Sequence, residues 1–172
     1  MKKILFLLIM IMSALLVGCG AKTQAPSASP EASTAYTVTD DAERKLSFAK
    51  KPSRIVSLTY GTDEILTEVV DTKRIQAYSR WAGDNEISFI TKEQAQKVGC
   101  KVHDSLENIL KLEPDLVVAS IATSNELVQS LEHMGIKVYI ARSPHNYQEM
   151  CAKIVNLAEA VGEKAKGEAL VS

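Results

Sequence analysis

Short apolar runs that alternate with helical patterns between residues 54 and 161 restrict the fold of this chain more than any other feature. The runs occupy residues 54–58, 74–78, 115–119 and 137–141, and three of them have nearly continuous apolar centres, as strands covered on both faces do. Apolar residues at helical spacing lie between and after the runs: Ile65, Leu66, Val69, Val70; Leu127, Val128, Leu131, Met134; Tyr147, Met150, Ile154, Leu157, Ala158 and Val161. The alternation predicts an α/β fold, a three-layer Rossmann-like lobe with a parallel sheet flanked by helices.

Turn and capping signals mark where several elements begin. Residues 36–39 and 45–48 alternate apolar and polar side chains about a polar turn, which predicts a small N-terminal β-hairpin. Thr91, Thr123 and Asn146 are each followed three residues later by Gln or Glu, the pattern of a capping box at a helix start.

Length and charge exclude some functions. The 172 residues suffice for one ordinary domain and are too few for two full ones. The 20 basic and 21 acidic residues give a net charge of -1, which argues against a protein that neutralises many nucleic-acid phosphates. We therefore expect no nucleic-acid partner. Three cysteines are too few for a disulfide scaffold.

The N-terminus has the pattern of a secretory signal. Lys2 and Lys3 precede an apolar run over residues 4–17, which as a helix is about 21 Å long, short of the roughly 30 Å hydrocarbon core of a bilayer. The run ends at Gly18-Cys19-Gly20, which resembles the bacterial lipobox, in which the cysteine is lipidated after cleavage. We interpret residues 1–18 as a lipoprotein signal peptide and Cys19 as the lipidation site. The alternative is an ordinary signal peptide with an incidental cysteine.

A linker follows the lipidation site. Residues 19–35 are rich in Ala, Ser, Thr and Pro and contain no aliphatic side chain larger than Ala, so this segment cannot bury enough apolar surface to fold. We expect a flexible linker that tethers the domain to the cell membrane on its extracytoplasmic side, in a periplasm or at the cell surface.

Candidate ligand-binding residues follow the predicted strands. In an open parallel sheet, ligands bind beyond the carboxyl ends of the strands. Tyr60 follows the first run, Arg80 and Trp81 follow the second, and Arg142 and His145 follow the fourth. A cationic and aromatic rim suits a flat or anionic organic ligand. The alternative is that these loop side chains are simply solvated.

Several segments, in the same order along the chain, resemble one family. They are residues 51–58, 63–66, 98–99, 105–117 and 131–138, and the most specific pattern is Glu-x-Ile-x-x-Leu-x-Pro-Asp-Leu-Val, which begins at Glu107. These segments resemble the class III periplasmic binding proteins, the receptors of ABC importers for ferric siderophores, haem and cobalamin. The resemblance implies a binding protein rather than an enzyme, with permease transmembrane subunits as partners. The implied ligand is a metal chelate, either a ferric siderophore, a corrinoid or haem, and the resemblance implies no resident cofactor.

The resemblance also carries expectations about domains. Family members have two α/β lobes joined by a long helix. Residues 36–162 correspond to the N-terminal lobe, and residues 163–172 resemble the start of the interlobe helix, which we expect to fray without its partner lobe. On this resemblance we expect the second lobe to be missing from the chain, which would make it a truncated product or one part of a split receptor. The family often has Pro where this chain has Tyr60, which affects the shape of that loop.

One residue role carries over from the family. The Glu that opens the specific pattern contacts an arginine of the permease in this family, and here it is Glu107. A local alternative is that Glu107 stabilises the start of its own helix and reaches back toward the backbone of Asp104.

Other chemistry has weaker support in the sequence. His103, His133, His145, Cys100 and Cys151 contain one close pair and no second pair at zinc-site spacing, so we predict no metal site. A disulfide between the two cysteines is possible in an oxidising compartment. The chain lacks a Walker motif and a glycine-rich phosphate loop, which disfavours a nucleotide-binding enzyme. An inert or regulatory half-receptor, which docks on a permease without delivering ligand, is the second alternative.

Overall fold

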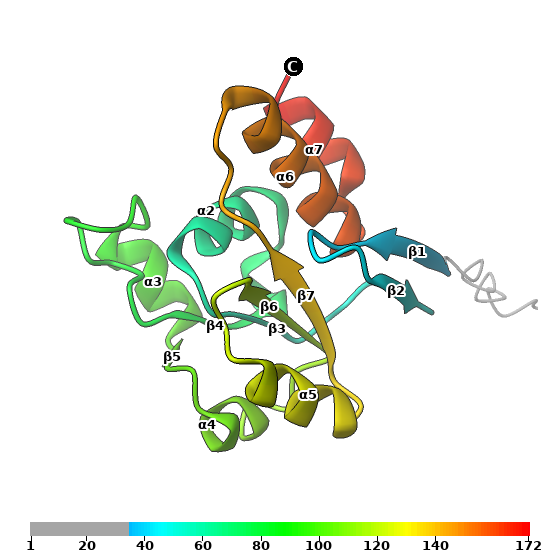
Figure 1. Cartoon of the computed structure of the whole chain (residues 1–172). Helices are drawn as coiled ribbons and strands as arrows, with labels where there is room; N and C mark the ends of the chain where they lie inside the picture. Colours follow the sequence, from blue (N-terminus) through cyan, green and yellow to red (C-terminus); the bar gives the residue numbers. More distant parts are fainter. Residues whose placement is uncertain (1–34) are drawn as a thin grey trace, which may run out of the picture. The chain divides into compact units, whose positions relative to one another are not determined.

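The computed structural model describes residues 35–172, which form a parallel sheet between two groups of helices (Figure 1). The predicted signal peptide, Cys19 and nearly all of the predicted linker lie outside these residues. The strands are β1 (Tyr36–Thr39), β2 (Lys45–Phe48), β3 (Ile55–Ser57), β4 (Ile75–Ser79), β5 (Lys101–Val102), β6 (Leu116–Ser120) and β7 (Lys137–Ala141). The helices are α2 (Tyr60–Val69), the 3-10 helix η1 (Thr72–Arg74), α3 (Lys92–Val98), α4 (Leu106–Leu110), α5 (Asn125–His133), α6 (Tyr147–Ala160) and α7 (Lys164–Leu170). In this part of the chain, no helix combines the length and apolar character needed to cross a bilayer.

The sheet is parallel throughout, with strand order β5-β4-β3-β6-β7. The chain starts the sheet in the middle with β3, adds β4 and β5 on one side, and then crosses to the other side for β6 and β7. The direction of winding therefore reverses between β3 and β6. Such a topological switch point is where an open α/β sheet leaves a crevice at the carboxyl ends of its strands.

Alternating side chains of the strands supply two cores. On β6, Leu116 and Val118 belong to the core that also contains residues of α2, α3, α6 and the hairpin. Val117 and Ala119 belong to the opposite core, together with residues of α4 and α5. All four side chains are fully buried, which explains why this strand is a continuous apolar run. The predicted three-layer α/β architecture is confirmed.

The predicted hairpin is also present, and it covers the edge of the sheet. β1 and β2 pair antiparallel, and the turn between them hydrogen-bonds to β7. The Asp41 N–H donates to the Ile140 carbonyl at 3.0 Å, and the Ile140 N–H donates to an Asp40 carboxylate oxygen at 3.2 Å. A strand edge with unpaired backbone groups favours aggregation, so this turn protects β7.

Two local features differ from the sequence prediction. Strand β5, at the other edge of the sheet, was not predicted, because its two residues are too short for a period-2 pattern. Helix α5 begins one residue later than predicted, because the side chain of Ser124 accepts the hydrogen bond from the Leu127 N–H and caps the helix. The Thr123 hydroxyl instead accepts a hydrogen bond from the Ser120 N–H at 3.2 Å.

The segment after Gly162, which we expected to fray, is helical in the structure. It forms α7, which packs against α6 (Figure 1). Gly167 is buried at this contact, where an added Cβ would lie only 2.5 Å from the Cβ of Ala158. The Glu163 carboxylate forms ion pairs with Arg74 at 2.6 Å and with Lys51 at 3.3 Å. These contacts stabilise α7 on residues of the lobe itself.

Candidate functional site

A hollow of about 680 Å³ opens at the switch point. Its lining comes from the loops after β3, β6 and β7 and from one face each of α2, α6 and α7. The lining residues are Thr59, Tyr60, Gly61, Glu64, Ile65, Glu68, Ser120, Ala141, Ser143, Pro144, Met150, Lys153, Ile154 and Leu170. We call this cavity the switch-point hollow. Its walls combine aliphatic side chains with hydroxyl groups and with the charged side chains of Glu64, Glu68 and Lys153.

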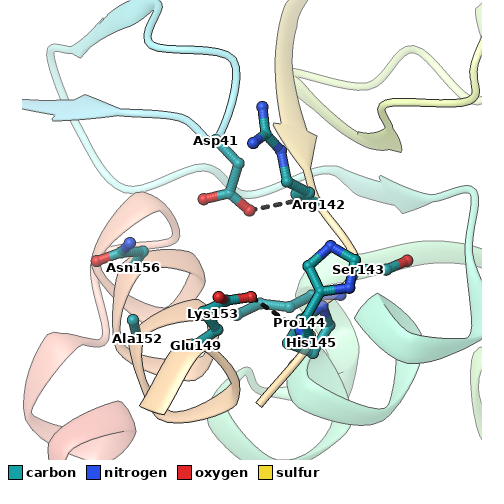
Figure 2. A pocket seen from close by; sticks show the side chains of 9 residues that line it. All are labelled: Asp41, Arg142, Ser143, Pro144, His145, Glu149, Ala152, Lys153 and Asn156. Carbon is teal, nitrogen blue, oxygen red and sulfur yellow. Dashed lines mark hydrogen bonds between the residues drawn. The ribbon is translucent and has the colours of Figure 1, made fainter. Parts of the chain in front are cut away.

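A second hollow of about 270 Å³ adjoins the first (Figure 2). Its lining residues are Asp41, Arg142, Ser143, Pro144, His145, Glu149, Ala152, Lys153 and Asn156. We call it the side hollow. The two hollows share Ser143, Pro144 and Lys153, so a ligand that enters one can extend toward the other.

Hydroxyl groups shape the β3–α2 loop, which carries Tyr60. The Thr59 side chain caps α2 by accepting a hydrogen bond from the Thr62 N–H. The buried Thr62 hydroxyl in turn lies 2.8 Å from the Ser57 hydroxyl at the end of β3. Tyr60 is the first residue of α2, and about half of its side chain is exposed at the rim of the switch-point hollow.

A buried carboxylate connects this loop to the end of β4. Asp63, in the first turn of α2, is fully buried and accepts hydrogen bonds from the Ser79 hydroxyl at 2.6 Å and from the Ser79 N–H. Burial raises the pKa of Asp63 to about 7, although the hydrogen bonds from Ser79 oppose the shift. Asp63 was not among the predicted site residues. It supports the loops rather than lining either hollow.

The structure separates Arg80 and Trp81 from the two hollows. The Arg80 guanidinium stacks over the Trp81 indole, 4.2 Å from the ring centroid. Arg80 lines a different surface depression of about 460 Å³, together with Asp84, Glu86 and Lys92. The five predicted ligand-binding residues therefore lie in two places, with Tyr60, Arg142 and His145 in one group.

The loop that carries Arg142 and His145 is shaped by two carboxylates. The Arg142 N–H donates to Asp41 at 2.7 Å, and the His145 N–H donates to Glu149 at 2.8 Å, as the dashed lines in Figure 2 show. Asn146 caps α6 by accepting a hydrogen bond from the Glu149 N–H, which confirms the predicted helix start. Both carboxylates thus bond to backbone N–H groups, while the Arg142 and His145 side chains remain exposed.

Lys153 is a lining residue that the sequence analysis missed. It lies on α6, is half-buried and borders both hollows. Burial lowers the pKa of Lys153, and the charges of Asp41 and Glu64 oppose this shift. The available signal was weak, since a lysine beside an apolar stripe is typical of any surface helix.

Glu107, the predicted contact for the permease, lies on α4, which is distant in the sequence from the loop that carries Arg142 and His145. Its carboxylate is exposed and pairs with Lys111, one turn later, at 2.7 Å. In the structure, the Glu107 carboxylate does not reach back toward the Asp104 backbone, so this alternative is wrong. Ser105 occupies the N-cap position of α4.

The remaining candidates for metal or redox chemistry lie apart. Cys100 and Cys151 are both free thiols, and His133 is exposed on α5. Across residues 35–172, His, Cys, Asp and Glu side chains form no group of three or more that could hold a metal ion.

Solved structures of periplasmic solute-binding proteins have a similar fold. A periplasmic solute-binding protein from Veillonella parvula superposes with a TM-score of 0.66 at 20% identity, covering 80% of this chain and 44% of that protein. A possible iron-binding periplasmic solute-binding protein from Staphylococcus epidermidis superposes with a TM-score of 0.61 at 21% identity, covering 71% of this chain and 47% of the other. These similarities show a shared fold.

Sequence comparisons extend the similarity. The ABC transporter substrate-binding lipoprotein YvrC of Bacillus subtilis is 27% identical over 95% of this chain and 52% of its own length. The iron-uptake system-binding protein of the same organism is 25% identical over 100% of this chain and 54% of its own length. The chain therefore spans about half the length of these relatives. Residues 55–172 match the model of the family described as periplasmic binding protein, and the chain belongs to that family, in its class III form.

Proposed function

We propose that this chain is the N-terminal lobe of an extracytoplasmic substrate-binding lipoprotein that serves an ABC importer for a metal chelate. The observation that carries the proposal is the switch-point hollow, because its position beyond β3 and β6 is where this topology binds ligands. The family consists of substrate-binding transport proteins, so the proposal includes no catalytic step.

A ferric siderophore is our first choice of chelate, ahead of a corrinoid and haem. Relatives include a probable siderophore-binding lipoprotein and an iron-uptake binding protein. Aliphatic walls such as Ile65 and Ile154 suit the organic frame of a chelate. Arg142 and Lys153 at the two hollows suit its anionic donor groups, since charge-assisted hydrogen bonds to carboxylates and catecholates are strong.

The anchor and the docking contact complete the proposal. Cys19 carries the lipid, which holds the lobe at the extracytoplasmic face of the cell membrane. Glu107 is the contact for the permease, and its exposed position on α4 leaves it accessible. Glu107 lines neither hollow, so ligand binding and docking can be tested separately.

Calorimetric titration of the purified full chain tests the ligand. The panel contains an anionic iron(III) tris-catecholate, an uncharged iron(III) trihydroxamate, haemin and a corrinoid. We expect saturable but weak binding of an iron chelate, because this lobe covers only one face of a ligand while complete pockets cover most of it. Calorimetry is preferable to quenching of Trp81, since the indole lies beneath Arg80 and outside both hollows.

A blocking variant identifies the site. Ser143 is exposed and lines both hollows, so Ser143→Trp should fill the opening and abolish the heat of binding. Ala165→Trp, on the exposed face of α7, is the matched control and should bind like the parent. If no chelate in the panel binds the parent, the proposed function is wrong.

A further inference from the structure

We propose that Lys153 selects an anionic ligand at the switch-point hollow, so that the chain takes a negatively charged metal chelate in preference to an uncharged one. The inference rests on the proposed function, because it names the class of chelate that the same hollow binds. It assigns the selective charge to a residue on α6 rather than to the arginines of the strand-end loops.

The position of Lys153 is the first argument. Its side chain lies at the boundary between the two hollows and lines both of them. A Cβ added to Gly61 would lie 3.7 Å from the Lys153 Nζ, so the ammonium group lies beside the first turn of α2. A ligand in the switch-point hollow therefore meets a cation in the wall of the hollow, beside the first turn of α2.

The lack of a partner is the second argument. Within residues 35–172, no carboxylate lies within 4.0 Å of the Lys153 Nζ, and no hydrogen-bond acceptor pairs with it. A half-buried cation loses hydration, and the charges of Asp41 and Glu64 offset only part of this loss, so that burial still lowers the pKa of Lys153. An anionic ligand group supplies the missing partner.

Three carboxylates that act on Lys153 or share a hollow with it already accept hydrogen bonds from other donors. Asp41 accepts from the Arg142 N–H, and Glu149 accepts from the His145 N–H and the Asn146 side chain. Glu64 accepts from the Phe89 N–H at 2.9 Å and from the Ser88 hydroxyl at 3.3 Å. These hydrogen bonds hold the three carboxylates against the backbone of the neighbouring loops. The Lys153 ammonium therefore remains available to a ligand.

The lining of the hollow defines the rest of the ligand. Pro144, Met150 and Ile154 form apolar wall, and the Thr59, Ser120 and Ser143 side chains supply hydroxyl groups. Two carboxylates, Glu64 and Glu68, also line the hollow, and among its described lining residues Lys153 is the one cation. A ligand that matches this lining has an apolar frame, several polar edges and a negatively charged part that faces Lys153 rather than Glu64 or Glu68. Catecholate and hydroxycarboxylate complexes of iron(III) have this character, whereas a trihydroxamate complex is uncharged.

Paired titrations test the inference. Calorimetry compares an iron(III) tris-catecholate, which is trianionic, with an uncharged iron(III) trihydroxamate, on the full chain and on three variants. Lys153→Met removes the charge and keeps most of the length, and Lys153→Arg keeps the charge. Lys73→Met removes an exposed lysine that lines neither hollow and serves as the control.

We expect Lys153→Met to weaken tris-catecholate binding by about tenfold or more, the usual effect of losing a hydrogen bond to a charged group. Binding of the trihydroxamate should stay within about twofold of the parent in the same comparison. Lys153→Arg and Lys73→Met should both behave like the parent. Added salt should weaken binding of the tris-catecholate to the parent more than to Lys153→Met, because salt screens the charge interaction.

The outcomes separate this inference from the proposed function. If the parent binds neither iron complex, nor haemin, nor a corrinoid, the proposed function fails and this inference fails with it. If the parent binds a chelate but Lys153→Met changes both iron complexes equally, Lys153 is a packing residue and only this inference is wrong. Preference of the parent for the uncharged complex would likewise overturn the inference and leave the proposed function intact.

Discussion

Arg74 donates a 2.6 Å hydrogen bond from Nη1 to Oε1 of Glu163, and this ion pair joins the segment after Gly162 to the start of β4. Arg74 also donates to the carbonyls of Val161 and Pro52, so one guanidinium connects three parts of the chain. Both side chains of the pair are less than one-fifth exposed. Removing one of them therefore leaves the other charge poorly hydrated and without its partner.

The first prediction concerns this ion pair. Glu163→Gln should lower the free energy of unfolding by about 2 kcal/mol, the usual effect of losing a hydrogen bond between charged groups. Hydrogen exchange should show protected amides in α7 of the parent and faster exchange in the variant. The control is Glu168→Gln, which changes an exposed carboxylate of the same helix. Unprotected α7 amides in the parent would contradict the packing of α7.

Acidity should have the same effect as the Glu163 substitution. Burial raises the pKa of Glu163, but the hydrogen bond to Lys51 and the charges of Lys51, Lys166 and Arg74 outweigh it and lower the pKa below 4.5. A carboxyl group with a lowered pKa in the folded state stabilises the fold above its unfolded pKa. Its contribution is lost as the pH falls through the folded value, so α7 should lose protection in acid in the parent but not in Glu163→Gln.

The second prediction concerns the contact between α6 and α7. A Cβ on Gly167 would lie 2.5 Å from the Ala158 Cβ and 3.2 Å from the Ile154 carbonyl oxygen. Gly167→Ala should therefore destabilise the chain by about 1–3 kcal/mol through overpacking, although alanine is the better helix former. Adding Ala158→Gly should recover part of this loss, because it removes the atom of closest contact. Urea denaturation of the parent and both variants measures these differences, and a stabilising Gly167→Ala would mean that the helices lie further apart.

Much of the fold could be predicted from the sequence, because burial on both faces produces a pattern that is visible without neighbours. Leu116 to Ala119 are all apolar, and each faces one of the two cores. Strand β5 could not be predicted, because two residues are too few to show an alternation of apolar and polar side chains. The helix start at Ser124 was displaced by one residue, because Thr123 and Ser124 are both good caps and only the fold decides between them.

The site was only partly predictable, because strand order decides which loops meet. Arg80 follows β4 and Arg142 follows β7, and β3 and β6 lie between these strands. Three strand spacings separate the two loops by about 14 Å, so the two arginines line different depressions. Lys153 could not be recognised, because a lysine on an amphipathic helix has the same pattern whether it faces solvent or a hollow.

The third prediction concerns Asp63. Its pKa is raised by burial and by the charge of Glu64, from 3.8 to about 7, so the folded state binds a proton that the unfolded state releases between these values. Stability from this group is therefore greatest below the unfolded pKa and declines as the pH rises toward about 7. Asp63→Asn cannot titrate and should escape this decline. Relative to that of the parent, the free energy of unfolding of the variant should rise by on the order of 4 kcal/mol between acid and neutral pH.

Urea denaturation over this pH range measures the difference between the parent and Asp63→Asn, which cancels the titration of the other groups. Asp104→Asn, at an exposed aspartate, is the control and should follow the parent. A constant difference between Asp63→Asn and the parent across the range would show that Asp63 titrates normally.

The fourth prediction concerns the anchor. We expect Cys19→Ser to shift the chain from the membrane fraction to the soluble fraction, because two or more acyl chains anchor stably and their loss leaves no equivalent attachment. Cys100→Ser and Cys151→Ser are matched controls, since both residues are free thiols in the folded domain. Full retention of Cys19→Ser in the membrane fraction would contradict the lipoprotein proposal.

The fifth prediction concerns docking through Glu107. Its partner in the free chain is Lys111, and both side chains are largely exposed, so the pair contributes at most about 1 kcal/mol to stability. Glu107→Arg should therefore leave the melting temperature nearly unchanged while abolishing association with the permease, since a like charge placed opposite an arginine is strongly unfavourable. Glu126→Arg, an equal charge change in the first turn of α5, is the control and should still associate. Loss of the fold in Glu107→Arg would assign this carboxylate a structural role, and unchanged association would place the permease contact elsewhere on the lobe.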